Sequence, residues 1–182
     1  MKNLDASRRA LHVIDTATDL FKKYGFNKVG VDQIIAESQI NKGTFYSYFH
    51  SKERFIEWCL VAQKEQLQEK VSVVSELYQN ADLSDQLRQI YLLHADLKSA
   101  YYLLFKAIFE VKKLYPNAYQ TALRYRRWLK NEIFCLLMET KKQFPIQKQK
   151  YLYLMDGAIL GLLSSDEERE RDALLEYFLK RV

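Results

Sequence analysis

The sequence has few of the residues that interrupt helices or crosslink chains: its 182 residues include only 5 glycines, 2 prolines and 2 cysteines. Average proteins contain about 7% glycine and 5% proline, so this composition predicts helices joined by short turns. No apolar run approaches the ~18 residues of a membrane-spanning helix, and the first residues lack the apolar core of a signal peptide. We therefore expect an all-α protein that resides in the cytoplasm without contacting a membrane.

The cysteines and histidines form no recognisable chemical pattern. Cys59 and Cys135 are far apart and have apolar neighbours, and the 3 histidines are scattered. Neither spacing is typical of metal ligands, so we expect no metal site and no cofactor. Two buried, inert thiols are the expectation, with a redox-sensing thiol as the alternative. His94 and Asp96 have the wrong spacing for an acid–base pair, which argues against an enzyme.

Basic residues are concentrated in the middle of the chain, where residues 98–150 contain 12 lysines and arginines but only 3 acidic residues. Such an excess favours an anionic ligand, although a solvated helix face explains most charge runs. Charge alone therefore does not decide the function.

Apolar spacing predicts three short helices at the start of the chain, over residues 8–24, 31–37 and 42–49. The stripe expected to be buried in the first helix consists of Leu11, Ile14, Ala17 and Phe21. Asn41 is expected to cap the third helix, because an asparagine side chain can accept from the free amides of a first turn. Two short helices joined by a tight turn at residues 38–41 predict a helix-turn-helix.

The remainder of the chain also has helical periodicity. A long helix is expected to begin at Lys52, and five more are expected near residues 85–97, 98–114, 117–143, 146–163 and 166–181. No alternating pattern of β-branched residues suggests a strand. The prediction is an all-α chain of about nine helices.

Residues 29–53 resemble the DNA-binding segment of the TetR family of repressors. The resemblance is carried by Ile40, Asn41-Lys42-Gly43-Thr44-Phe45-Tyr46, Tyr48-Phe49 and Ser51-Lys52-Glu53, and it covers roughly residues 8–60. It implies a three-helix DNA-binding domain at residues 1–50 and a helical effector-binding and dimerisation domain at residues 51–182. It also implies a ligand-responsive repressor that binds a palindromic operator on double-stranded DNA as a homodimer.

The resemblance further implies a set of DNA contacts. Backbone contacts are expected from Tyr46, Thr44 and Lys52, and base contacts from Asn41, Lys42, Gly43 and Ser47. Short polar side chains at the start of a helix suit the major groove and its phosphates, although Tyr46 as a half-buried packing residue is the alternative. Gln39 stands where the family usually has glycine, so we expect a left-handed conformation costing roughly 1 kcal/mol, which a DNA contact would offset.

Aromatic residues are frequent between residues 91 and 134, and they have two interpretations. They form an ordinary core, or several of them line a cavity for a small-molecule effector of unknown identity. The residues expected to line such a cavity are His94, Tyr102, Phe105, Phe109, Tyr125 and Trp128.

Two apolar stripes occur in the final two predicted helices. In the TetR family these helices form a four-helix bundle between two chains, while packing within one chain is the alternative. The residues expected at the dimer contact are Met155, Ala158, Ile159, Leu162, Leu174 and Phe178.

Two functional alternatives stay open. A ligand carrier with a vestigial helix-turn-helix would show no salt-dependent DNA binding, whereas a regulator would. Activation in place of repression depends on where the operator lies relative to a promoter.

Overall fold

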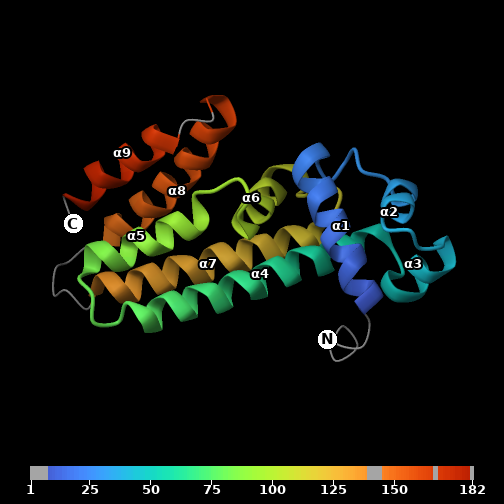
Figure 1. Ribbon diagram of the computed structural model, residues 1–182, viewed down its shortest axis with the longest axis horizontal. Coiled ribbons are helices and arrows are strands. Elements are labelled where there is room, and N and C mark those ends of the chain that lie inside the picture. The colour runs from blue at the N-terminus through green and yellow to red at the C-terminus, as the bar shows by residue number, and fades with distance from the viewer. Residues whose placement is uncertain (1–7, 139–144, 166–167, 181–182) are drawn as a thin grey trace. The chain divides into compact units, whose positions relative to one another are not determined.

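The computed structural model describes residues 8–138, 145–165 and 168–180, and within these ranges the chain forms nine α-helices and no strand (Figure 1). The predicted all-α class is confirmed. The helices are α1 (Arg8–Tyr24), α2 (Val31–Glu37), α3 (Lys42–Phe49), α4 (Lys52–Leu77), α5 (Leu83–His94), α6 (Ala100–Glu110), α7 (Pro116–Met138), α8 (Pro145–Ser165) and α9 (Glu168–Leu179).

Helix α5 and the corner that follows it depart from the predicted helix boundaries. Helix α5 begins two residues early because the Asp82 carboxylate caps it, accepting from the Asp85 amide at 2.8 Å. Beyond its end, the Ser99 hydroxyl donates to the Leu93 carbonyl at 2.7 Å. Such side-chain bonds to the backbone compete with a continuing helix, so residues 95–99 form a turn.

The chain folds into two compact units. The first consists of residues 1–64 and 103–123, and the second consists of residues 65–102 and 124–182. Helices α4, α6 and α7 therefore contribute residues to both units. The first unit is larger than the predicted 1–50 domain, because the start of α4, the end of α6 and the start of α7 also belong to it.

Phenylalanines form the core of the first unit. Phe45 and Phe49 of α3 pack against Phe55 of α4, with ring centroids 5.0 and 4.5 Å from Phe55, and Phe21 stacks on Phe26 at 4.8 Å. All five rings are at most 1% exposed. Because burial of each such ring stabilises a fold by about 2–3 kcal/mol, these contacts hold α1, α3 and α4 together.

Helix α1 buries one stripe, as predicted, but the stripe is displaced. Ile14, Ala17 and Phe21 are buried as expected, whereas Leu11 is 46% exposed and Ala10 takes its place. Successive residues are about 100° apart around a helix, so Leu11 lies on the flank of the stripe that contains Ala10.

The loop between α1 and α2 is fixed by the end of α6. The Phe26 amide donates to the Glu110 carboxylate at 2.8 Å, and the Asn27 side chain donates to the Glu110 carbonyl at 3.2 Å. Gly25 has φ +89°, and a Cβ built there would lie 2.7 Å from Glu110 Oε2. The positive φ favours glycine, and a Cβ at this position would push aside the Glu110 carboxylate that holds the loop before α2.

Buried tyrosines characterise the second unit. Tyr91, Tyr101, Tyr125 and Tyr151 are fully buried, and each hydroxyl has a hydrogen-bond partner. The partners are the Arg171 carbonyl for Tyr91, Asp156 and Arg126 for Tyr101, His94 for Tyr125, and the Leu87 carbonyl for Tyr151. These bonds link α5, α6, α7, α8 and α9 within one unit.

Candidate functional site

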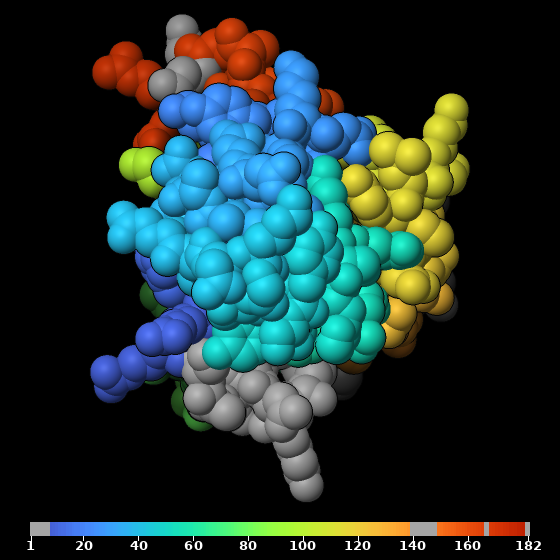
Figure 2. Space-filling model, turned by 90° about the vertical axis from the view of Figure 1, so that its right-hand side faces the viewer, coloured from blue at the N-terminus to red at the C-terminus, as the bar shows by residue number. Residues whose placement is uncertain are grey.

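Helix α3 has one buried and one exposed face. Phe45 and Phe49 are 0% and 1% exposed and face the core. The opposite face is exposed and carries Asn41, Lys42, Gly43, Tyr46 and Ser47, while Thr44 is half-buried. Figure 2 views this side of the molecule, with α2 and α3 coloured light blue to turquoise. The sequence-predicted DNA contacts of α3 therefore lie on one accessible surface, which we call the reading surface.

Asn41 fixes the start of this surface. Its backbone is extended and its Oδ1 accepts from the Thr44 amide at 2.7 Å, so the predicted N-cap is confirmed. Gly30, at the corresponding position of α2, provides no side-chain cap. The start of α3 is thus better anchored than the start of α2.

Lys42 forms an ion pair across the helix-turn-helix. Its ammonium lies 3.0 Å from Asp32 of α2, with the two side chains 64% and 84% exposed. The hydrogen bond that the ammonium donates to Asp32 raises the pKa of Lys42 above its ordinary value. Exposed pairs contribute only about 0–1 kcal/mol, so an incoming DNA acceptor can replace Asp32 at little cost.

Lys52 has a different environment from the one the sequence suggested. Its ammonium donates to the Phe26 carbonyl at 2.9 Å and lies 5.5 Å from the centroid of the Tyr115 ring. The residue is half-buried. In this arrangement Lys52 holds the α1–α2 loop. The ammonium has three donors, so its expected contact with the DNA backbone stays a prediction.

The turn between α2 and α3 contains a strained residue. Gln39 has φ +53°, which confirms the predicted left-handed conformation, and its side chain is exposed. Only glycine adopts this region without penalty. His50, directly after α3, also has a positive φ of 63°.

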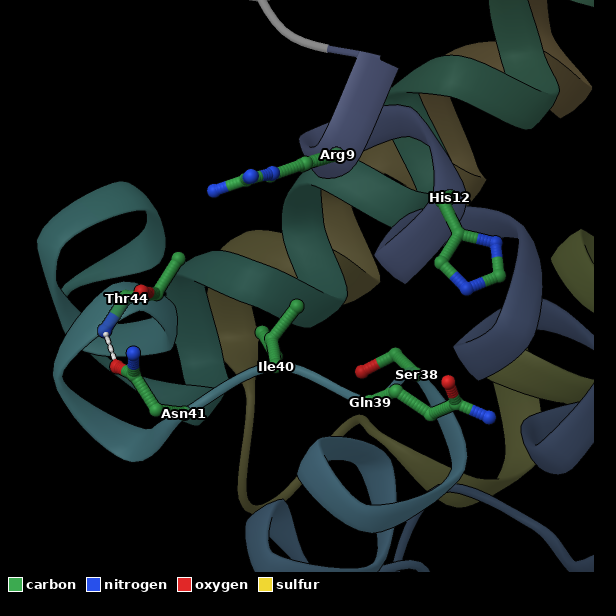
Figure 3. A pocket seen from close by; sticks show the side chains of 7 residues that line it. All are labelled: Arg9, His12, Ser38, Gln39, Ile40, Asn41 and Thr44. Carbon is green, nitrogen blue, oxygen red and sulfur yellow. Dashed lines mark hydrogen bonds between the residues drawn. The ribbon is translucent and has the colours of Figure 1, made fainter.

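A pocket of about 400 Å³ lies beside the reading surface (Figure 3). Its lining includes Arg9 and His12 of α1, which sequence reasoning did not select. Their spacing of three residues, which puts both on one face of a helix, was the available signal.

His94, expected to orient an effector, is satisfied within the protein. It is fully buried, with Nδ1 2.6 Å from the Ile90 carbonyl and Nε2 2.6 Å from the Tyr125 hydroxyl. Because a carbonyl can only accept, Nδ1 carries the proton and Nε2 accepts from Tyr125. Burial lowers the pKa of His94 to about 4, so the ring is neutral at pH 7.

The six residues expected to line a cavity are distributed over both units. His94, Tyr125 and Trp128 pack directly on one another in the second unit, with the Tyr125 and Trp128 rings 5.5 Å apart. Half-buried Tyr102 belongs to the same unit. Phe105 and Phe109 belong to the first unit, and Phe109 is 70% exposed. Core packing accounts for the first three residues, and the exposure of Phe109 contradicts a place in a cavity lining.

The second unit also contains a buried ion pair that sequence reasoning missed. Arg126 of α7 makes two hydrogen bonds of 2.7 Å to Asp156 of α8, and the Tyr101 hydroxyl bonds to both. The two charged side chains are only 17% and 16% exposed. Their separation of 30 residues leaves no local signal in the sequence.

The expected dimer contacts require a correction. Met155, Ala158, Ile159 and Leu162 are 0–6% exposed because they pack inside the second unit, so they offer no surface to a partner. Phe178 is half-buried against Tyr151, with ring centroids 5.5 Å apart, whereas Leu174 is 47% exposed. The exposed apolar residues of these two helices are instead Tyr153, Leu160, Leu163, Leu174 and Tyr177.

The two cysteines differ from one another. Cys59 is buried as expected, and burial raises the pKa of its thiol, whereas Cys135 is exposed, contrary to expectation. Among the described residues, no three His, Cys, Asp or Glu side chains are grouped as metal ligands. Likewise, none of the helices described here has the length and apolar character needed to cross a bilayer.

Comparison with known proteins connects the reading surface to a family. Residues 13–58 match the family of bacterial regulatory proteins named after tetR. Over 44 residues the chain is 46% identical to the uncharacterized HTH-type transcriptional regulator YuxN of Bacillus subtilis, a match that covers 24% of this chain and 15% of that relative's length.

Solved structures resemble the fold over nearly the whole chain. The reduced form of E. coli NemR has a TM-score of 0.77 at 22% identity, covering 93% of this chain and 95% of that one. A tetR-family regulator from Agrobacterium tumefaciens has a TM-score of 0.83 at 14% identity, covering 96% and 97%. At these identities the likeness establishes the fold alone.

Proposed function

Because residues 13–58 match the family of bacterial regulatory proteins named after tetR, we propose that the chain is a ligand-responsive transcriptional repressor. It binds a palindromic DNA operator as a homodimer. The observation that carries the proposal is the amphipathic character of α3, whose phenylalanines are buried and whose polar side chains are exposed. The family is one of transcriptional regulators, which agrees with the expectation that the chain is not an enzyme. The proposed DNA binding supports the expectation that the protein acts in the cytoplasm.

The reading surface supports a division of labour among the side chains of α3. Tyr46, 40% exposed, and Thr44 contact phosphates, which positions the protein without reading sequence. Lys42 and Ser47 point toward base edges in the major groove, where a lysine donates to guanine. Gly43 allows close approach of the helix, and Asn41 orients its first turn.

Selection of bound duplexes from a random pool, followed by affinity measurements at several salt concentrations, tests the DNA proposal. The selected sequences should form a near-palindrome with half-sites about one helical turn apart. Lys42→Ala should change which base is tolerated at one position of each half-site. Lys70→Ala, an exposed lysine of α4, is the matched control and should leave base preference unchanged. Failure to enrich any duplex would favour the ligand carrier.

The homodimer is proposed to form through the exposed apolar residues of α8 and α9 named above. Tyr153, Leu160 and Tyr177 are 56–61% exposed, and contiguous apolar surface is typical of interaction sites, so we propose that these residues form one. A pocket on α9, lined by Glu170, Ala173, Leu174 and Tyr177, lies within this area. A two-fold partner would bring a second reading surface to the same DNA, which a palindrome requires.

Light scattering tests the dimer and its surface together. The wild type should have twice the chain mass of 21.7 kDa. Leu160→Arg should reduce the mass to that of one chain and weaken operator binding. Leu77→Arg, at a leucine of α4 that is 75% exposed, is the control and should remain dimeric. If the two variants have the same mass, the exposed residues of α8 and α9 are not the dimer contact.

The effector is proposed to bind the second unit and lower DNA affinity. Because His94, Tyr125 and Trp128 are packed together, an effector must displace some of these contacts, and it thereby favours another conformation. Trp128 fluorescence, measured in a Trp58→Phe background, reports such an event. A compound that changes this signal should lower the affinity of the protein for operator. By linkage, operator DNA should lower the affinity of the protein for the compound by the same factor. A signal change without any effect on DNA affinity would contradict the repressor proposal.

A further inference from the structure

The pocket beside the reading surface joins three segments of the helix-turn-helix. Its lining comes from the start of α1, the turn and the start of α3: Arg9, His12, Ser38, Gln39, Ile40, Asn41 and Thr44 (Figure 3). It contains no carboxylate. A pocket with an arginine, a histidine and amide groups, and without a negative charge, suits an anion.

Some of these polar groups are already engaged. The Ser38 hydroxyl donates to the Ile34 carbonyl, and Asn41 Oδ1 accepts from the Thr44 amide. No hydrogen bond or ion pair within the described chain occupies the side chains of Arg9 and His12. In Figure 3 the Arg9 side chain extends from α1 toward the Thr44 side of the pocket, while His12 lies on the opposite side. Arg9 and His12 are therefore the donors left for a ligand.

The strain at Gln39 is a second, independent observation at the same pocket. Its φ of +53° is unfavourable for a side chain with a Cβ, and glycine would relieve the strain. Figure 3 shows the Gln39 amide on the His12 side of the pocket. Retention of a strained, exposed glutamine is explained if its amide contributes to binding.

We propose that this pocket binds one phosphodiester group of the DNA backbone, with Arg9 as the principal donor and His12 and Gln39 as supporting donors. The inference rests on the proposed function, because it requires DNA on the reading surface. Helix α1 flanks α3, so its side chains meet the strand at the edge of the groove where phosphates are accessible. The planar guanidinium donates two parallel hydrogen bonds to phosphate oxygens, which a lysine cannot do.

The first test compares Arg9→Ala with Arg8→Ala on the selected operator and on a scrambled duplex. Arg8 is the matched control, because it is the adjacent exposed arginine of α1 and does not line the pocket. Arg9→Ala should weaken both duplexes by roughly tenfold per half-site. The slope of log affinity against log salt concentration should also become shallower by about two units per dimer, one for each lost phosphate contact. Equal effects of the two variants would overturn the proposal.

The second test identifies the phosphate. Operators with a single neutral methylphosphonate at each successive position are measured with wild type and with Arg9→Ala. At one position per half-site, the methylphosphonate should weaken operator binding by the wild type. At the same position it should leave operator binding by Arg9→Ala unchanged. Additive losses at every position would overturn the proposal. Inorganic phosphate added at constant ionic strength should not abolish this coupling, whereas a pocket for free phosphate would be filled by it.

These outcomes separate the inference from the proposed function. If the wild type binds no operator at all, the proposal that the chain is a DNA-binding regulator is wrong. Operator binding by wild type, together with Arg9→Ala behaving as Arg8→Ala, contradicts the phosphate pocket alone.

Discussion

The reading surface and the polar network of the second unit use similar side chains in opposite ways. On the reading surface, Lys42 and Asp32 form a pair that is largely exposed, and Tyr46 is 40% exposed. In the second unit, Arg126, Asp156 and Tyr101 bond to one another away from solvent. The comparison teaches that a polar residue on a helix indicates a binding function only where its hydrogen bonds are not already made inside the fold.

Removing one partner from each ion pair should break this comparison most clearly. Asp156→Ala leaves Arg126 without its carboxylate in a mostly buried position, which should cost about 3–5 kcal/mol of unfolding free energy. Asp32→Ala, the matched change on the reading surface, should cost no more than about 1 kcal/mol. Denaturant unfolding monitored by circular dichroism measures both. Equal losses would mean that the two pairs have the same structural role.

Acidification should reveal a second difference between the two regions. The free energy of unfolding should depend on pH through buried His94 but not through exposed His12. The pKa of His94 is about 4 in the folded chain, where the ring is buried. In the unfolded chain the pKa has its ordinary value of about 6.5. The unfolded state therefore binds more protons between these values, and stability falls as pH is lowered through this window. The contribution of His94 should decrease by about 2 kcal/mol between pH 7 and pH 5.

Denaturant unfolding at both pH values measures this effect. His94→Gln cannot titrate and should lack that part of the pH dependence, while His12→Gln should retain it. A wild-type pH dependence in His94→Gln would assign the effect to other groups.

Relief of the strain at Gln39 should produce a smaller effect of opposite sign. Gln39→Gly should raise the free energy of unfolding by up to about 1 kcal/mol, because glycine adopts a positive φ without penalty. The same variant should bind DNA more weakly if the amide contacts the backbone. Thermal unfolding and operator affinity, measured together, test both statements. A more stable variant with unchanged affinity would show that the strain has no role in binding.

The smallest effect on stability is expected at Tyr46. Tyr46→Phe should change the free energy of unfolding by less than about 0.5 kcal/mol, as is usual for exposed positions. Its affinity for operator and scrambled duplexes should fall together, because a phosphate contact carries no sequence information. A stability loss comparable to that of a buried tyrosine would favour the packing role for Tyr46 considered above.

Local features of the helix-turn-helix were predictable from the sequence. The cap by Asn41, the left-handed Gln39 and the bounds of α1, α2 and α3 all depend on residues within about four positions of one another. Hydrogen bonds of this range are encoded by spacing alone. Contacts of long range were not predictable, because nothing near Lys52 specifies the Phe26 carbonyl, and nothing near Arg126 specifies Asp156.

Helix α8 shows a different reason for failure. It is apolar on more than one side, so periodicity does not say which side packs within the chain. Met155 and Ile159 were assigned to a partner, yet they are fully buried, while Tyr153 and Leu160 on the other side are exposed. Periodicity identifies an apolar face without identifying what covers it.

The bond between Phe26 and Glu110 affects the order in which the chain becomes able to fold during synthesis. The two residues are 84 positions apart, and the first unit also includes residues 103–123. At about 5–20 residues per second, the ribosome adds residues 65–123 over roughly 3 to 12 s after the helix-turn-helix has been made. During this interval the nascent helix-turn-helix lacks Glu110, so its loop after α1 is held less firmly than in the finished protein. The unit therefore reaches its final stability only once residues 103–123 have left the ribosome.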